Sequence, residues 1–141
     1  MTGSDKEPGV STLTLTKDNF AETISDNDIV FIDFWAAWCG PCRAFGPVYE
    51  EASDTHTDAV FAKVDTEDQQ ELAGMFGITS IPTLVAFREK VLVFGEAGAL
   101  PAPELEKVIT AVRELDMADV HEKVAQEKAK QEAAEASVQE A

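Results

Sequence analysis

Both cysteines of the chain lie in one short stretch, WAAWCGPCRAFGP, which runs from Trp35 to Pro47. Two residues separate Cys39 from Cys42. Thiols at this spacing can contribute to a metal site, close a small structural disulfide, or exchange electrons with another protein. The rest of the sequence indicates which of these uses applies.

A metal site is the first alternative. A structural zinc ion takes four protein ligands, and an iron–sulfur cluster takes four thiolates in most proteins. Besides the cysteines, the chain offers two histidines, His56 and His121, which are both distant in the sequence. We therefore expect no metal ligand set within one chain, and a metal ion shared between two chains stays an alternative.

A structural disulfide is the second alternative. A bond across two residues closes a very small loop and removes little conformational entropy from the unfolded chain. The chain has 141 residues, of which 45% are hydrophobic, so it can build a core without such a bond. Redox exchange is therefore the use of the cysteine pair that we favour.

The elements around the pair suit this chemistry. IVFIDFW, residues 29–35, is an apolar run typical of a strand covered on both faces of a mainly parallel sheet. A helical pattern begins at about Cys42. Cys39 then lies at a helix N-terminus, where free N–H groups and the helix dipole favour the thiolate that attacks disulfides. Cys42 lies one turn further in, where it can attack a mixed disulfide.

The other patterns alternate between strand and helix. Thr16 can cap a first helix, and three residues join the last two strands in a tight antiparallel hairpin. We expect further strands at 11–16, 59–65, 82–87 and 91–94, and further helices at 67–77 and 101–115. This order predicts an α/β fold in which a mixed central sheet is flanked by helices on both faces.

Composition divides the chain into three parts. We expect a disordered leader at 1–9, one domain at 10–115, and a C-terminal extension at 116–141 that is helical or disordered. The extension is rich in Ala, Glu, Lys and Gln, and its apolar residues are too sparse for a strong coiled-coil seam. A partner-binding helix is the alternative for this segment.

The formal net charge of −16 argues against nucleic acid and anionic membrane surfaces as partners, and it favours basic or neutral ones. No stretch approaches the roughly 20 apolar residues of a membrane span. The N-terminal sequence MTGSDKEPGV has no apolar run typical of a secretory signal. We therefore expect a cytoplasmic protein.

Several stretches in order resemble the thioredoxin family. WCGPC at 38–42, within DFWAAWCGPC at 33–42, resembles the signature of that family. AKVDTE (62–67) is similar to its next strand, FGITSIPTLVAF (76–87) to its cis-proline segment, and GAL (98–100) to a loop beside the active site. The resemblance covers about Val10 to Leu115 and implies the thioredoxin fold and a protein-disulfide reductase.

The resemblance implies a role for each matching residue. Cys39 matches the nucleophile and Cys42 the resolving cysteine, and together they form the redox disulfide. Asp33 matches a buried aspartate that moves protons for the resolving thiol, and Lys63 matches a lysine near it. A carboxyl group inside an apolar strand should also have a raised pKa. The alternatives are a solvent-facing Asp33 and a surface Lys63.

The resemblance also implies a substrate groove beside the cysteines. A cis Ile81–Pro82 bond facing them would leave the Ile81 backbone free to pair with an extended substrate strand. Trp38 is expected to cover the motif at the surface. The residues expected to contact substrate are Trp38, Gly40, Pro41, Ile81, Pro82, Gly98 and Ala99.

The implied partners are thioredoxin reductase and disulfide-bearing client proteins of a monomeric protein. No bound cofactor is implied, because NADPH acts indirectly through the reductase. A thioredoxin-like protein bound to one dedicated client, with exchange secondary, is the alternative function. An oxidase or isomerase of the same fold is a further alternative, and the Gly-Pro dipeptide argues against it. Lys90 departs from the family, because many thioredoxins have glycine at this turn position.

Overall fold

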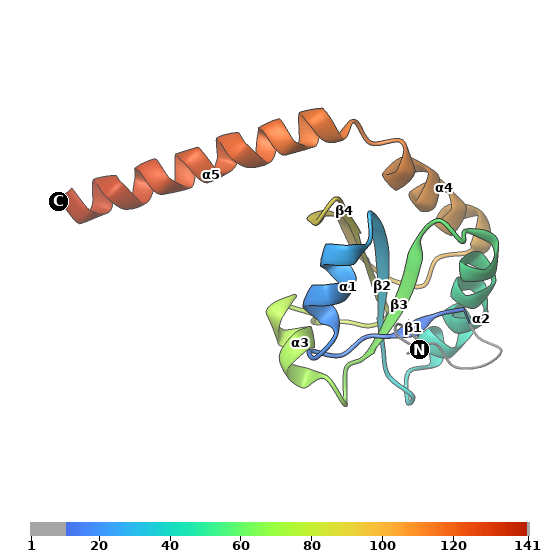
Figure 1. Ribbon diagram of the computed structural model, residues 1–141. Helices are drawn as coiled ribbons and strands as arrows, with labels where there is room; N and C mark the ends of the chain where they lie inside the picture. Colours follow the sequence, from blue (N-terminus) through green and yellow to red (C-terminus); the bar gives the residue numbers. More distant parts are fainter. Residues whose placement is uncertain (1–10, 141) are drawn as a thin grey trace.

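The computed structural model describes residues 11–140, so the leader predicted at 1–9 lies outside the described residues. Strands and helices alternate along most of the chain (Figure 1). In chain order they are β1 (Leu13–Thr14), α1 (Phe20–Asp26), β2 (Ile29–Trp35), α2 (Gly40–Thr55), β3 (Val60–Asp65), α3 (Gln70–Met75), β4 (Thr83–Arg88), β5 (Val91–Ala97), α4 (Ala102–Arg113) and α5 (Met117–Glu140).

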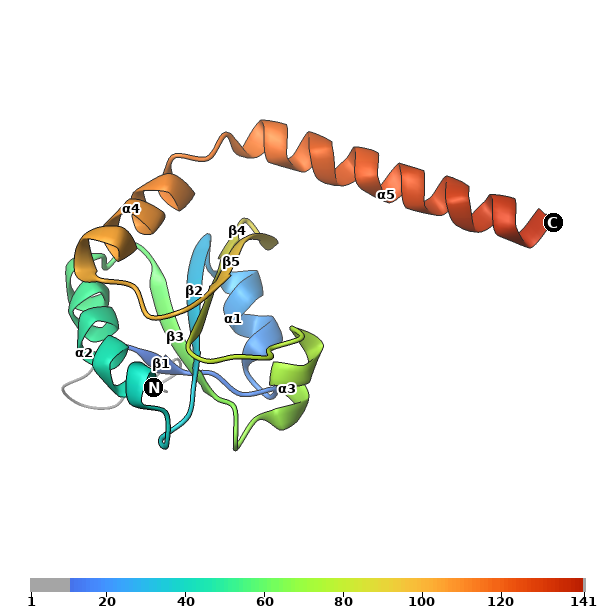
Figure 2. The same cartoon turned by 180° about the vertical axis from the view of Figure 1, so that it is seen from behind.

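The five strands form one mixed sheet in the order β1-β3-β2-β4-β5. β3 pairs in parallel with β1 and β2, whereas β4 pairs antiparallel with β2 and β5. Helices α2 and α4 cover one face of the sheet, and α1 and α3 cover the other, as the two opposite views show (Figures 1 and 2). The predicted mixed α/β architecture is therefore confirmed.

Strand β2 lies at the centre of the sheet and is buried from Ile29 to Phe34. Its side chains alternate between two cores, because successive residues of a strand point to opposite faces. Phe31 packs in the core beneath α2 and α4, whereas Ile32 packs in the core beneath α1 and α3. By the same alternation, Asp33 lies on the face covered by α2, the helix that carries Cys42.

Three predicted elements have bounds that differ from the structure. The strand expected at 11–16 pairs only at Leu13–Thr14, and the helix expected from about Cys42 extends over Gly40–Thr55. The helix expected at 67–77 is limited to Gln70–Met75. Its late start has a local cause, because Asp65 Oδ1 accepts the Glu67 N–H (2.9 Å) and so closes a turn before the helix.

The prediction that Thr16 caps the first helix was wrong. Helix α1 begins at Phe20, and Asn19 occupies its N-cap position. Asn19 Oδ1 accepts the backbone N–H of Thr16 at 2.7 Å, so these two residues close a turn that precedes the helix.

The hairpin between β4 and β5 is tighter, and β5 longer, than predicted. Two residues, Glu89 and Lys90, join the strands, with φ angles of 50° and 70°. Two left-handed residues are typical of a type I′ turn, whose twist suits a two-residue hairpin. Lys90 therefore adopts a left-handed conformation at the position where the resembling family often has glycine.

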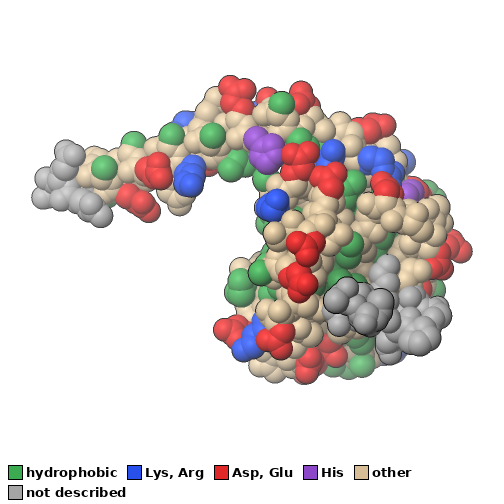
Figure 3. Space-filling view, viewed as in Figure 1, with side chains coloured by type: hydrophobic (Ala, Val, Ile, Leu, Met, Phe, Trp, Pro, Cys, Tyr) green, Lys and Arg blue, Asp and Glu red, His purple; other side chains and the backbone are tan. Residues whose placement is uncertain are grey.

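The C-terminal extension, predicted as helical or disordered, is the helix α5. Met117 is buried at its start, and His121 Nε2 lies 2.8 Å from Glu89 Oε1 at the β4–β5 turn. From His121 to Val138 every side chain is exposed. After its first turns, α5 points away from the rest of the protein, and the space-filling view shows a hollow beneath it (Figures 1 and 3).

Candidate active site

The structure joins Cys39 and Cys42 in a disulfide with a Cα–Cα distance of 5.2 Å. Cys39 is the N-cap of α2, and each cysteine is only 4% exposed. The Cys42 N–H donates to Cys39 Sγ at 3.2 Å. A sulfur that accepts from a helix N-terminus is placed where a negative charge is stabilised, so the local structure favours a thiolate at Cys39 once the pair is reduced.

The segment between β2 and α2 presents the pair at the end of the sheet. The Cys39 N–H donates to the Ala36 carbonyl at 3.2 Å, which turns the chain directly after the central strand. Pro41 lies in the first turn of α2, where its missing N–H leaves no helical hydrogen bond unmade. A side chain at Gly40 would meet no atom within 4 Å, so this residue leaves open space beside the disulfide.

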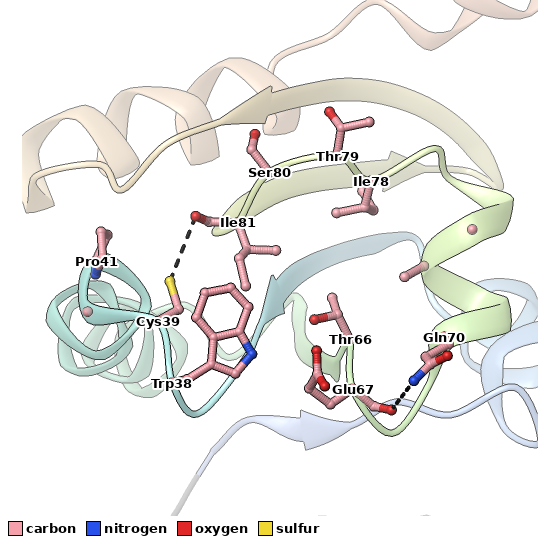
Figure 4. A pocket seen from close by; sticks show the side chains of 13 residues that line it. Trp38, Cys39, Pro41, Thr66, Glu67, Gln70, Ile78, Thr79, Ser80 and Ile81 are labelled. Atoms are coloured by element: carbon pink, nitrogen blue, oxygen red, sulfur yellow. Dashed lines mark hydrogen bonds between the residues drawn. The ribbon is translucent and has the colours of Figure 1, made fainter.

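The Ile81–Pro82 peptide bond is cis, as the resemblance implied. The Ile81 carbonyl oxygen lies 3.8 Å from Cys39 Sγ, so this segment faces the cysteines (Figure 4). The Gly98 N–H donates to the Pro82 carbonyl at 2.8 Å, which places residue 98 beside the cis bond. Gly98 has a φ of 114°, a conformation that residues with a side chain rarely adopt.

Asp33 is fully buried within β2, so the alternative of a solvent-facing carboxyl is wrong. Among the described residues, neither of its carboxylate oxygens has a hydrogen-bond partner. Burial raises the pKa of Asp33 from 3.8 to about 7, against the smaller opposing effect of the Lys63 charge. The predicted rise in pKa is confirmed, and the carboxyl can gain or lose a proton near neutral pH.

Lys63 is adjacent to Asp33 across the parallel β2–β3 pair. Its side chain is half-buried, and Nζ lies 4.8 Å from the ring centroid of Trp35, within the range of a cation–π interaction. Lys63 therefore acts on Asp33 through its charge and not through a hydrogen bond.

A groove of about 560 Å³ opens beside Cys39. Four of the residues predicted to contact substrate line it: Trp38, Gly40, Pro41 and Ile81. Pro82 is buried and does not line the groove, and Gly98 and Ala99 are exposed outside its lining. Trp38 is 66% exposed and projects into the opening, as expected for a residue that covers the motif (Figure 4).

Sequence reasoning missed the far wall of this groove. It is lined by residues 66–67, 70, 73–74 and 78–80. Residues 66–67 and 78–80 belong to the AKVDTE and FGITSIPTLVAF stretches, so the resemblance offered a signal for them. The three on α3 had no such signal, because only the fold brings that helix next to the cysteine loop.

Within residues 11–140, no group of three His, Cys, Asp or Glu residues could hold a metal ion. His56 and His121 are not near the cysteines but pair with Glu106 and Glu89, each at 2.8 Å. No helix in the described part of the chain combines the length and the apolar character needed to cross a membrane.

Residues 11–111 match the family model described as Thioredoxin. The chain belongs to the thioredoxin family. Thioredoxins reduce protein disulfides by exchange with a dithiol, and this chain is a protein-disulfide reductase with its redox-active pair at Cys39 and Cys42. The thioredoxin match ends within α4, so α5 lies beyond it.

Thioredoxins of several organisms are similar to this chain. A Streptomyces coelicolor protein assigned as a thioredoxin 2 is 57% identical over 119 residues, which cover 84% of this chain and 89% of that protein. A thioredoxin of Alicyclobacillus acidocaldarius is 43% identical over 103 residues, which cover 72% of this chain and 98% of that protein. The solved structure of a mutant thioredoxin from Halobacterium salinarum superimposes with a TM-score of 0.69 at 34% identity, covering 78% of this chain and 98% of that one.

Proposed function

We propose that this thioredoxin-family protein is a general reductase of client-protein disulfides, with Cys39 as nucleophile and Cys42 as resolving cysteine. The observation that carries this assignment is the position of Cys39. Its sulfur accepts the Cys42 N–H at the start of α2 and faces the Ile81 carbonyl beside an open groove.

In the first step, the Cys39 thiolate attacks one sulfur of a client disulfide. A bond forms between Cys39 and that sulfur while the client disulfide breaks, and the second client sulfur leaves as a thiolate. The N-terminus of α2 supports the thiolate before the attack. A client strand that pairs with the Ile81 backbone would hold its cysteine at the required position.

In the second step, Cys42 loses its proton and attacks the Cys39 sulfur. The mixed disulfide breaks, the client leaves with two reduced cysteines, and a Cys39–Cys42 disulfide remains. Asp33 would accept the Cys42 proton, because it lies on the sheet face covered by α2 and its pKa is about 7. The half-buried Lys63 would keep the Asp33 carboxylate accessible near neutral pH, since its charge lowers that pKa.

The substrate contacts follow from the groove. Trp38, Gly40 and Pro41 form the rim on the cysteine side. Ile81 of the cis Ile81–Pro82 segment faces Cys39, and the exposed Gly98–Ala99 loop, hydrogen-bonded to Pro82, would extend this surface. We assign this activity to residues 10–115 and regard residues 116–141 as an extension.

Two electrons must return to the disulfide after each cycle. We assign this step to thioredoxin reductase, with NADPH as the electron source and no cofactor bound to this chain. The protein would act in the cytoplasm, where thiol systems are kept reduced. We further propose a monomer, since a net charge of −16 opposes self-association.

The test is NADPH consumption by the thioredoxin reductase of the same organism, with this protein and insulin as the client disulfide. Turnover is expected with the wild-type protein and not with Cys39→Ser. A wild-type protein that a small dithiol reduces, but that supports no turnover of insulin, would contradict the assignment as a general reductase.

A further inference from the structure

The lining of the active-site groove carries one formal charge. Among the described residues that line it, Glu67 alone is ionisable apart from the disulfide-bonded Cys39. The other side chains that line the groove carry no formal charge, being hydroxyl, amide, sulfur, indole or apolar groups. Whatever segment occupies the groove therefore meets a single negative charge in an otherwise uncharged wall.

The backbone of Glu67 is held in place while its carboxylate is left to the groove. Its N–H donates to Asp65 Oδ1 at 2.9 Å, and its carbonyl accepts from Gln70 Nε2 at 3.2 Å (Figure 4). Within the described chain, no hydrogen bond or ion pair engages the Glu67 carboxylate, which is exposed. This charge is therefore available to a ligand.

Trp38 provides a second feature that attracts a cation. In Figure 4 its ring lies between the Cys39 sulfur and the segment that carries Thr66 and Glu67, and the side chain is 66% exposed. The face of an exposed indole binds ammonium and guanidinium groups. A side chain that passes from Cys39 over Trp38 toward Glu67 meets first the indole face and then the carboxylate.

The cationic side chains nearest in the sequence and fold, Arg43 and Lys63, do not occupy the space between Trp38 and Glu67. Arg43 donates from Nη1 to the Ala37 carbonyl at 2.8 Å, and Lys63 lies over Trp35. Neither residue lines the groove.

We propose that the groove selects client segments with a lysine or arginine close to the reacting cysteine, and that Glu67 is the residue that determines this preference. The proposal rests on the reductase function proposed above. The attraction of a cation to the acidic surface as a whole is screened beyond about 8–10 Å in physiological salt, whereas a contact inside the groove persists.

The experiment compares three peptides that each contain one disulfide and differ at the residue beside the reactive cysteine, which is Lys, Gln or Glu. The kcat/KM for reduction of each peptide by the pre-reduced protein is measured at low and at physiological ionic strength. The Lys peptide is expected to react about two- to fivefold faster than the Gln peptide, as for an exposed ion pair, and the Glu peptide is expected to react slowest.

Glu67→Gln should bring the Lys-to-Gln ratio close to one, and Glu67→Lys should favour the Glu peptide. The matched control is Asp68→Asn, which removes one negative charge at the adjacent exposed residue outside the groove. This control should retain the wild-type ratio.

An equal decrease of the Lys-to-Gln ratio of kcat/KM in Glu67→Gln and Asp68→Asn would overturn the proposal, because it would assign the preference for the Lys peptide to the overall charge of the protein. A Lys-to-Gln ratio of one in the wild-type protein would also overturn the proposal. If that protein still reduced all three peptides, the reductase function would remain supported. Failure to reduce the Gln peptide, together with failure in the insulin assay, would instead reject the function on which the proposal rests.

Discussion

At the scale of single residues, Asp33 is an ionisable group buried among apolar side chains. Ionising a buried carboxyl that lacks hydrogen-bond partners is unfavourable, and this is the cause of its pKa of about 7. Because the same group titrates at about 3.8 in an unfolded chain, the folded protein holds a proton between these pH values that the unfolded chain has lost. The contribution of Asp33 to the free energy of unfolding therefore decreases as pH rises from about 4 to about 7 and is constant above that range.

Replacing Asp33 by Ala should remove this dependence. The pKa difference of Asp33 between the folded and unfolded states corresponds to about 4 kcal/mol of unfolding free energy at 1.36 kcal/mol per pKa unit. Asp33→Ala should therefore unfold at a clearly higher urea concentration than the wild-type protein at pH 8, and the two should differ much less at pH 4. Urea unfolding of both oxidised proteins at the two pH values measures this effect. The control is Asp68→Ala on the surface, and an equal gain in that variant would contradict the explanation.

A second prediction concerns the order of the two cysteines. Cys42→Ser should accumulate mixed disulfides with client proteins in a cell lysate, because the residue that releases the client is absent. Cys39→Ser should accumulate none, since the remaining Cys42 lies within the first turn of α2 and, unlike Cys39, does not line the groove. Non-reducing electrophoresis after capture of each variant separates these results, and adducts formed mainly by Cys39→Ser would reverse the assigned roles.

At the scale of elements, the two-residue β4–β5 turn places a lysine in the left-handed conformation that glycine adopts more easily. Lys90 has a φ of 70°, and a left-handed conformation costs a residue with a side chain about 1–2 kcal/mol. Lys90→Gly should relieve this cost, and the greater entropy of glycine in the unfolded chain offsets part of the gain. We expect a net stabilisation of about 0.5–1 kcal/mol.

Chemical denaturation at one pH measures this change. Lys90→Ala is the matched control, because it removes the same charge but keeps the side-chain carbon that disfavours the turn. A gain as large in Lys90→Ala as in Lys90→Gly would show that the lysine charge, and not the backbone, limits stability at this turn.

The elements also show how much the sequence could predict. β2 and α2 were foreseen because an apolar run and the CGPC stretch are strong local signals, and these two elements position Cys39, Cys42 and Asp33. The ends of β1 and α3 depend on side-chain hydrogen bonds that periodicity does not reveal. The far wall of the groove was missed because it combines a loop and a helix that only the tertiary fold brings to the cysteines.

At the scale of the whole molecule, the cysteines and α5 lie at opposite ends of β2. Cys39 lies just beyond Trp35, the last residue of that strand. Glu89, which pairs with His121 of α5, donates its N–H to the Asp28 carbonyl just before the strand begins. In Figure 1 the connection from β2 to α2 lies at the end of the sheet away from α5. The helix is therefore remote from the groove in which clients would bind.

Ending the chain after His121 should keep Met117 and the His121–Glu89 pair in place and leave insulin reduction within about twofold of the full-length rate, as for other surface changes. The reductase-coupled assay compares the two proteins at equal concentration. A loss of tenfold or more, with unchanged thermal unfolding, would instead assign α5 to the binding of clients or of the reductase.

The 24 residues of α5 form a helix about 36 Å long at 1.5 Å per residue. The part after its first turns is an arm that projects from the rest of the protein (Figure 1). The length of the helix is comparable to the diameter of a compact body whose radius of gyration is about 13–14 Å. The arm adds frictional drag, so a monomer should sediment more slowly, tumble more anisotropically and leave a gel-filtration column earlier than a compact protein of the same mass. Its molar mass should therefore be determined by light scattering, which is independent of shape.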